Sequence, residues 1–157
     1  MTNPMLVDAL CALLAIMLLW AAVVDIRTFT ISNRLNLSIA LLAPLFWWAT
    51  GTELWPEAAI RIGVAAGVFV LLALAFQLGA MGGGDVKLAA ALALWFAPGD
   101  TLLLIVLMSL AGGVLTLIVL GVHRARKIHG RPEVPYGVAI AFGGLWLLAQ
   151  RFLNQFA

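Results

Sequence analysis

Charged side chains are scarce in this sequence. Only 10% of its 157 residues are charged, 64% are hydrophobic and the mean hydropathy is +1.11, whereas a soluble domain has about 25% charged residues. Because so few charges cannot cover a globular surface, an ordinary soluble domain is excluded. The composition predicts an all-α, polytopic membrane protein in the lipid bilayer. At about 20 residues per span there is room for about six transmembrane helices, so residues 1–157 are predicted to form a single transmembrane domain.

Cysteine and histidine are also rare. The only cysteine is Cys11, in the first apolar run, so an internal disulfide and a four-cysteine zinc site are both excluded. We interpret Cys11 as a small apolar residue that fills space. His123 and His129 lie in a basic loop without cysteine, and two exposed imidazoles rarely suffice to hold a metal ion. We therefore expect no metal and no other cofactor.

No lysine or arginine precedes Arg27, so the first apolar run lacks the positive segment of a signal peptide and is predicted to be an uncleaved spanning helix. The predicted helices cover residues 5–24, 33–48, 58–79, 86–97, 101–122 and 135–153. The fourth would be about 18 Å long, less than the roughly 30 Å hydrocarbon core. It is expected either to lie tilted among the other helices or to follow a turn that dips into the membrane.

Basic residues mark alternate loops. Seven of the nine fall in the loops after the first, third and fifth helices: Arg27, Arg34, Lys87, Arg124, Arg126, Lys127 and Arg131. This positive-inside pattern predicts that these loops are cytoplasmic, that both termini are outside and that the protein is a multi-pass protein of the cytoplasmic (inner) membrane. Although the net charge is +2, the positive residues do not form one basic face, so no nucleic-acid partner is expected.

Small and aromatic residues give further expectations. The G-x-x-x-G spacing at residues 63–67 favours close approach of a neighbouring helix. The glycine pair at residues 112–113 is expected to allow close packing or a bend, and residues 98–100 are expected to form a tight turn. An aromatic belt at the membrane interface is expected from Trp47, Trp48 and Trp55.

One stretch combines glycine with charge: residues 81–87 read Met-Gly-Gly-Gly-Asp-Val-Lys. Glycine has no Cβ and permits sharp turns and close approach, so Gly82 to Gly84 are predicted to form a turn. Asp85 would then stand at the start of the fourth helix. Two interpretations are open: Asp85 is a helix N-cap, or it is a functional ionisable residue at membrane depth.

Asp25 ends the first apolar run. One interpretation is a boundary charge that pairs with Arg27 or Arg34. The other is a partner of Asp85, because an even number of crossings separates the two aspartates and places both on the predicted cytoplasmic face. Two such carboxylates can share a proton and activate a water molecule, which is the chemistry of aspartic proteases. The competing function is a membrane carrier or assembly subunit in which the aspartates bind a proton or a cation.

The expected helix ends suggest separate roles. Asp25 falls near the negative C-terminal end of the first helix, and Asp85 falls at the positive N-terminal start of the fourth, with Lys87 close by. Asp85 is therefore predicted to be the ionised base, and Asp25 the residue that carries the proton.

The motifs also resemble a known family. Residues 82–85 match the G-x-G-D signature of polytopic membrane aspartic proteases. Residues 25–33 resemble the first aspartate segment of the prepilin peptidase family, D-x-R-x-x-x-I-x-N, with Ser32 in place of the usual proline. Residues 134–137, Val-Pro-Tyr-Gly, are similar to the family's Pro-aromatic-Gly segment before the last helix. The candidate site comprises catalytic Asp25 and Asp85 with supporting Gly82, Gly84, Lys87, Arg27, Asn33, Pro135 and Gly137.

This resemblance implies a leader peptidase that cuts type IV prepilins or pseudopilins at the cytoplasmic side of the membrane. Larger members of the family carry a four-cysteine cytoplasmic segment and also N-methylate the product. This chain lacks that segment, and it resembles the short members that serve Flp or tight-adherence pili, so methylation is not implied.

Overall fold

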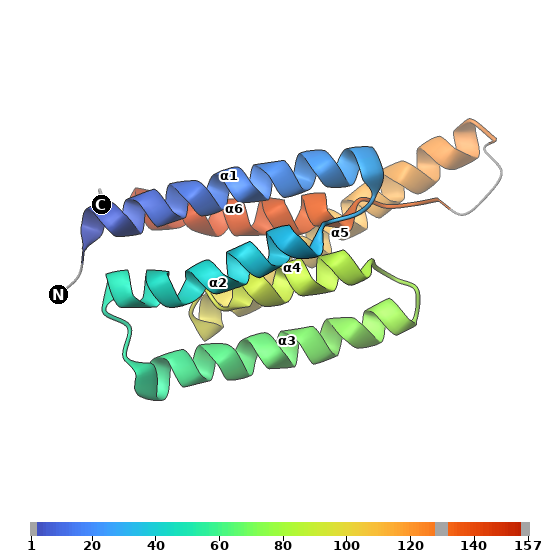
Figure 1. Ribbon diagram of the computed structural model, residues 1–157. Coiled ribbons are helices and arrows are strands. Elements are labelled where there is room, and N and C mark those ends of the chain that lie inside the picture. The colour runs from blue at the N-terminus through green and yellow to red at the C-terminus, as the bar shows by residue number, and fades with distance from the viewer. Residues whose placement is uncertain (1–2, 128–131, 155–157) are drawn as a thin grey trace.

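The computed structural model describes residues 3–127 and 132–154. Within these residues the chain forms six α-helices and one short π-helical turn, and no strand is present among them (Figure 1). The elements are α1 (Pro4–Thr28), α2 (Asn33–Thr50), η1 (Leu54–Ala58), α3 (Ala59–Gln77), α4 (Gly83–Ala93), α5 (Pro98–Ala125) and α6 (Tyr136–Asn154). The all-α prediction and the number of helices are confirmed.

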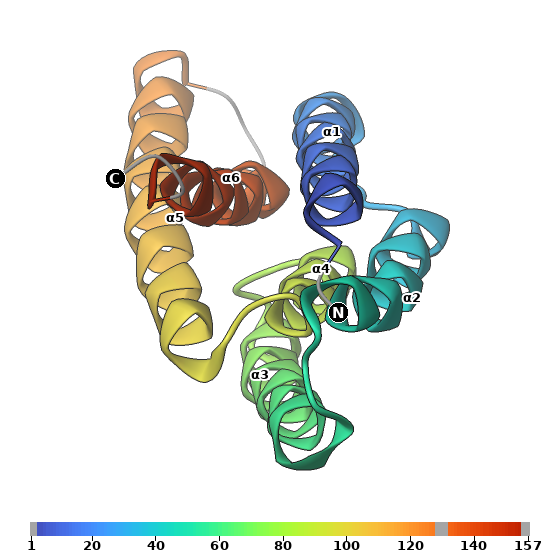
Figure 2. The same ribbon diagram turned by 90° about the vertical axis from the view of Figure 1, so that its left-hand side faces the viewer.

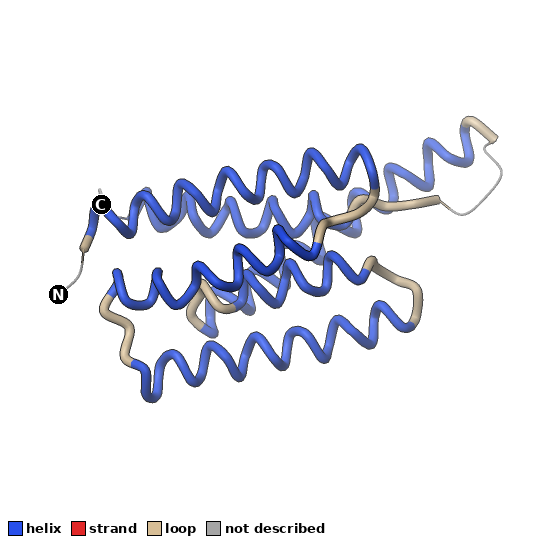
Figure 3. Tube along the Cα trace, in the orientation of Figure 1, coloured by secondary structure: helices blue, strands red, loops and turns tan. Residues whose placement is uncertain are grey.

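Consecutive helices run in opposite directions, so the C-terminal ends of α1, α3 and α5 lie together at one end of the bundle (Figures 1 and 3). We call this the aspartate end, and the opposite one the far end. Arg27, Lys87 and Arg126 all belong to segments at the aspartate end, whereas Arg61 and Arg151 belong to the far end. The structure thus reproduces the predicted alternation of basic segments. Arg131 and His129 lie outside the described residues.

Four segments are long and apolar enough to cross a membrane: Pro4–Thr28, Leu54–Gln77, Pro98–Ala125 and Tyr136–Asn154. Large apolar side chains also cover much of their outer surface. Ile16, Leu71 and Leu117, for example, are 63%, 56% and 71% exposed. Such a surface suits lipid and not water, so the fold is that of a multi-pass membrane protein.

Helix α4 is the short element at the centre of the bundle (Figure 2). Its 11 residues span only about 17 Å, and it packs against α2, α3, α5 and α6. Seven of the 11 are buried: Asp85, Val86, Leu88, Ala89, Ala91, Leu92 and Ala93. Of the two arrangements expected for this helix, the structure has the one in which it is embedded among the others.

Helix α5 follows the short α4 and is the longest helix among the described residues. It begins inside the bundle, short of the far end, and its C-terminal part projects beyond the other helices at the aspartate end (Figure 1). Its 28 residues span about 42 Å, against a hydrocarbon core of about 30 Å. The packing is closest where Gly112 meets the ring of Tyr136, since a Cβ at Gly112 would lie 2.5 Å from Tyr136 Cε1. The predicted close packing at residues 112–113 is therefore confirmed at Gly112.

Two tryptophans tie α2 to the end of α4. The indole N–H of Trp47 donates to the carbonyl of Leu94 at 2.8 Å, and that of Trp95 donates to the carbonyl of Ile39 at 2.9 Å. Trp47 is only 7% exposed, so its predicted place in an aromatic belt was wrong. Trp48 and Trp55, which are 69% and 80% exposed, do face outward.

Several local predictions were wrong. Gly83 and Gly84 are the first residues of α4 and not part of a turn; the preceding turn instead uses Gly79, with φ 72°. Glycine is costly mainly in the interior of a helix, where it loses the most backbone entropy, and both residues stand in the first turn of α4. Pro98 likewise opens α5, where its missing N–H costs nothing. A Cβ at Gly63 or Gly67 would meet nothing within 4 Å, so no helix of the described chain packs on that spacing.

Of the remaining local predictions, the cap of α2 and the role of Cys11 are confirmed, and the end of α1 differs. The Ser32 hydroxyl accepts a hydrogen bond from Leu35 N at 3.3 Å and caps α2, as predicted. Helix α1 continues four residues beyond its predicted end, to Thr28, and stops at Phe29 in a left-handed conformation with φ 50°. Cys11 is 2% exposed and belongs to the apolar core, in agreement with its predicted role as a filler.

Candidate active site

Asp25 lies in the last turn of α1, where its carbonyl accepts a hydrogen bond from Phe29 N, and is only 2% exposed. Its Oδ2 accepts a hydrogen bond of 2.7 Å from the backbone N–H of Gly137, at the start of α6. Arg27 and Arg34 are exposed, and neither forms an ion pair within the described residues. The interpretation of Asp25 as a boundary charge paired with an arginine is therefore excluded.

Asp85 lies in the first turn of α4 and is 6% exposed. Its Oδ2 accepts a hydrogen bond of 3.1 Å from Gly82 N, so the carboxylate reaches back over the start of its own helix. The N-cap position itself is occupied by Gly82, and the N-cap interpretation of Asp85 was wrong. The second oxygen, Oδ1, is buried and has no hydrogen-bond partner among the described residues. A buried carboxylate oxygen that is left unpaired is costly in a structural role.

The two aspartates approach each other at the aspartate end. Asp25 and Asp85 are close enough for the charge of one to act on the other. They come from helices that are separated by two crossings and 60 positions in the sequence. Burial of two neighbouring carboxyl groups is costly for a fold, so this arrangement points to chemistry.

Ile31 lies between the start of α4 and the start of α6. A Cβ at Gly84 would lie 2.9 Å from the carbonyl oxygen of Ile31 and 3.2 Å from its backbone nitrogen. A Cβ at Gly137 would lie 2.5 Å from Ile31 Cδ1 and 2.8 Å from Asp25 Oδ2. Glycine at both positions therefore lets α4 and α6 pack directly on one residue of the α1–α2 connection.

The amide of Asn36 fixes the start of α4 against α2. Its Nδ2 donates to the carbonyl of Gly84 at 2.9 Å, and the residue is 4% exposed. Sequence reasoning missed Asn36. The signal was present, because an asparagine in an apolar helix needs a buried partner.

The remaining supporting residues are at the edge of the site. Lys87 Nζ donates to Asn33 Oδ1 at 2.8 Å, and both side chains are exposed. Pro135 precedes α6 and accepts a hydrogen bond from Val138 N at 3.2 Å. Arg27 is exposed in the last turn of α1 and is not brought to the aspartates by any contact within the described residues.

Asp25 and Asp85 occupy the helix ends on which the predicted separation of roles was based. Asp25 lies three residues before the C-terminal end of α1, and Asp85 lies in the first turn of α4. In the structure each carboxylate accepts a hydrogen bond from a backbone N–H at a helix N-terminus, Gly137 of α6 for Asp25 and Gly82 of α4 for Asp85. Helix ends therefore do not distinguish the base from the proton carrier.

No group of three or more His, Cys, Asp or Glu side chains that could hold a metal ion occurs within residues 3–127 and 132–154. Among these residues the site offers two carboxylates, backbone N–H groups and amides. This set can polarise and protonate a substrate carbonyl and activate water.

The sequence was compared with known protein families. The model of the type IV leader peptidase family matches residues 12–117. The chain belongs to this family. The matched region contains both Asp25 and Asp85 and ends before Pro135 and Gly137. Comparisons with curated proteins and with solved structures found no match.

Proposed function

We propose that this leader peptidase is an aspartic endopeptidase in which Asp25 and Asp85 form the catalytic pair. The observation that carries the proposal is the burial of two neighbouring carboxyl groups, Asp25 of α1 and Asp85 of α4, at one end of a membrane bundle. One carboxylate carries a proton and hydrogen-bonds the scissile carbonyl. The other is ionised and takes a proton from the attacking water. The unpaired Oδ1 of Asp85 is available to accept a hydrogen bond from the attacking water.

The proposed substrate is a type IV prepilin or pseudopilin, cut at the cytoplasmic face of the inner membrane. Family membership supports this substrate class. The excess of lysine and arginine at the aspartate end supports a cytoplasmic site, because such residues are retained on that side. The chain has a single cysteine and so cannot hold the four-cysteine segment of larger members, which favours a Flp-like pilin as substrate.

The proposal is tested by incubating the purified protein in detergent with a prepilin and measuring product masses. Asp25→Asn and Asp85→Asn should each abolish leader removal while the protein still inserts and folds. The double variant should be hardly worse than either single variant, because the two residues act as one unit. Asp8→Asn, in the same helix as Asp25 but at the far end, is the matched control and should keep wild-type activity.

Cleavage by either single variant at more than a few per cent of the wild-type rate would remove that residue from the mechanism. A carrier with the same pair would instead show proton or cation flux across vesicles and no cleavage of any prepilin.

A further inference from the structure

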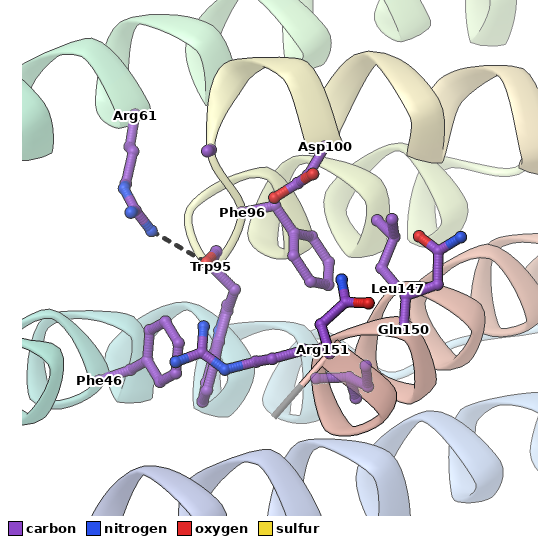
Figure 4. Close-up of a pocket in the computed structure, with 11 residues that line it drawn as sticks. Phe46, Arg61, Trp95, Phe96, Asp100, Leu147, Gln150 and Arg151 are labelled. Carbon is purple, nitrogen blue, oxygen red and sulfur yellow. Dashed lines mark hydrogen bonds between the residues drawn. The ribbon is translucent and has the colours of Figure 1, made fainter. Parts of the chain in front are cut away.

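A second polar site lies at the far end of the bundle, away from the aspartates. It is a cavity of about 460 Å³ between α2, α3, α6 and the α4–α5 connection (Figure 4). Its origin is the shortness of α4. Because α4 ends at Ala93 and α5 begins at Pro98, the chain turns back before it reaches the far end, and the space beyond the turn is left to side chains from the neighbouring helices.

Two arginines face this cavity. Arg61 donates from Nη1 to the carbonyl of Trp95 at 3.0 Å, and the guanidinium of Arg151 lies 5.2 Å from the centre of the Phe46 ring. Figure 4 shows that they reach the cavity from different helices, α3 and α6. Both arginines line the same cavity, and neither forms an ion pair within the described residues.

One carboxylate also lines the cavity. Asp100, in the first turn of α5, acts electrostatically on Arg61, as Glu57 does from outside the cavity. Because two guanidinium groups face one lining carboxylate, the lining keeps a net positive charge. An anion in the cavity would be attracted by both Arg61 and Arg151.

The rest of the lining is divided between donors and aromatic rings. Gln150 and Asn154 of α6 contribute amides to the lining, and the buried rings of Phe46, Trp95 and Phe96 contribute its aromatic part. Arginine binds phosphate with two parallel hydrogen bonds, and an apolar floor suits the glycerol and upper acyl part of a lipid. The level of the cavity in the membrane also fits a lipid headgroup. The exposed Trp48 and Trp55 at this end are typical of the headgroup level of a bilayer.

We propose that this cavity binds the phosphate headgroup of a membrane phospholipid, with Arg61 and Arg151 as the phosphate ligands. The bound lipid would neutralise the guanidinium pair and fill the space that the short α4 leaves open. This inference does not rest on the catalytic proposal, because the cavity and the aspartates lie at opposite ends of the bundle.

The test uses the full-length purified protein, delipidated in detergent, and measures binding by native mass spectrometry. The probes are phosphatidylglycerol, a diacylglycerol with the same acyl chains and inorganic phosphate as a competitor. Phosphatidylglycerol should bind and diacylglycerol should not. Arg61→Gln and Arg151→Gln should each weaken phosphatidylglycerol binding about tenfold, the loss expected for one charge-assisted hydrogen bond.

Arg124→Gln and Arg126→Gln are the matched controls, since they remove the same charge at the aspartate end and should leave binding unchanged. If Arg61→Gln does not fold, Arg151→Gln decides the test alone, because Arg151 is exposed in the last turn of α6. If millimolar phosphate displaces the lipid, the cavity binds phosphate, but its ligand is the free ion and not the lipid headgroup. Equal binding of diacylglycerol, or equal losses in the control variants, would overturn the proposal.

Discussion

The contact between Gly84 and Ile31 makes Gly84→Ala the sharpest test of how the site is held. The added methyl would lie 2.9 Å from the carbonyl oxygen of Ile31 and 3.2 Å from its nitrogen. Both are backbone atoms, so no rotamer change can relieve the contact. Since non-bonded heavy atoms normally keep about 3.5 Å apart, α4 must move away from Ile31 by about half an ångström.

This movement should cost activity more than stability. Overpacking costs about 1–3 kcal/mol, and alanine recovers little of this at Gly84, because the residue stands in the first turn of α4 and not in the helix interior. A loss of this size should still leave the protein folded. Asp85 is the next residue and moves with the backbone. If a misplacement of 1 Å costs about a hundredfold in rate, half of that predicts a fall of about tenfold.

The assay is the initial rate of prepilin cleavage by purified variants, measured by product mass at equal amounts of folded protein. Gly63→Ala is the matched control. It makes the same chemical change inside a helix, but its methyl would meet nothing within 4 Å, so it should keep the wild-type rate. A Gly84→Ala rate within twofold of the wild type, or equal losses in both variants, would refute the reasoning.

The other predictions concern neighbouring contacts and the orientation of the bundle. Gly137→Ala would place a methyl 2.8 Å from Asp25 Oδ2 and should lower the cleavage rate at least about tenfold by displacing that carboxylate; an unchanged rate in the same assay would contradict it. Asn33→Ala removes the acceptor of Lys87 Nζ and, because such an exposed contact contributes about 0–1 kcal/mol, should lower the rate less than about fivefold. A larger loss would mean that Asn33 or Lys87 contacts the substrate. Reporter fusions in the loops of the aspartate end should be cytoplasmic, and a fusion between α2 and α3 should report the other side; agreement between the two sets would disprove the orientation.

Much of the architecture could be predicted because the apolar runs are local signals. Runs of hydrophobic residues gave the number of helices, and their alternation brought Asp25 and Asp85 to one end without knowledge of any contact. The capping role of Ser32 was also predictable, since its bond to Leu35 N spans three residues. The start of α4 was predicted wrongly. The prediction gave more weight to the tendency of glycine to form turns than to the ability of Asp85 to accept a hydrogen bond from Gly82 N, which begins the helix earlier.

Long-range contacts could not be predicted from the sequence for a different reason. The bond from Asn36 to the Gly84 carbonyl joins residues 48 positions apart, and no local pattern encodes such a pairing. Gly137 was identified only through its resemblance to a family segment, and its hydrogen bond to Asp25 became visible only in the structure. The helix-end argument for separate roles was incomplete for a similar reason, because it considered the helices that carry the aspartates and not α6, whose Gly137 N–H donates to Asp25.

The position of Ile31 between two glycines has a genetic consequence. Ile31→Val should restore part of the activity lost in Gly137→Ala, because it removes Ile31 Cδ1, the nearest obstacle to the new methyl, but leaves the contact with Asp25 Oδ2 at 2.8 Å. Gly84→Ala should have no revertant at position 31, since any side chain leaves the same carbonyl oxygen in place. In alignments of homologues, the residue at position 31 should therefore covary with the residue at 137 and remain independent of the residue at 84.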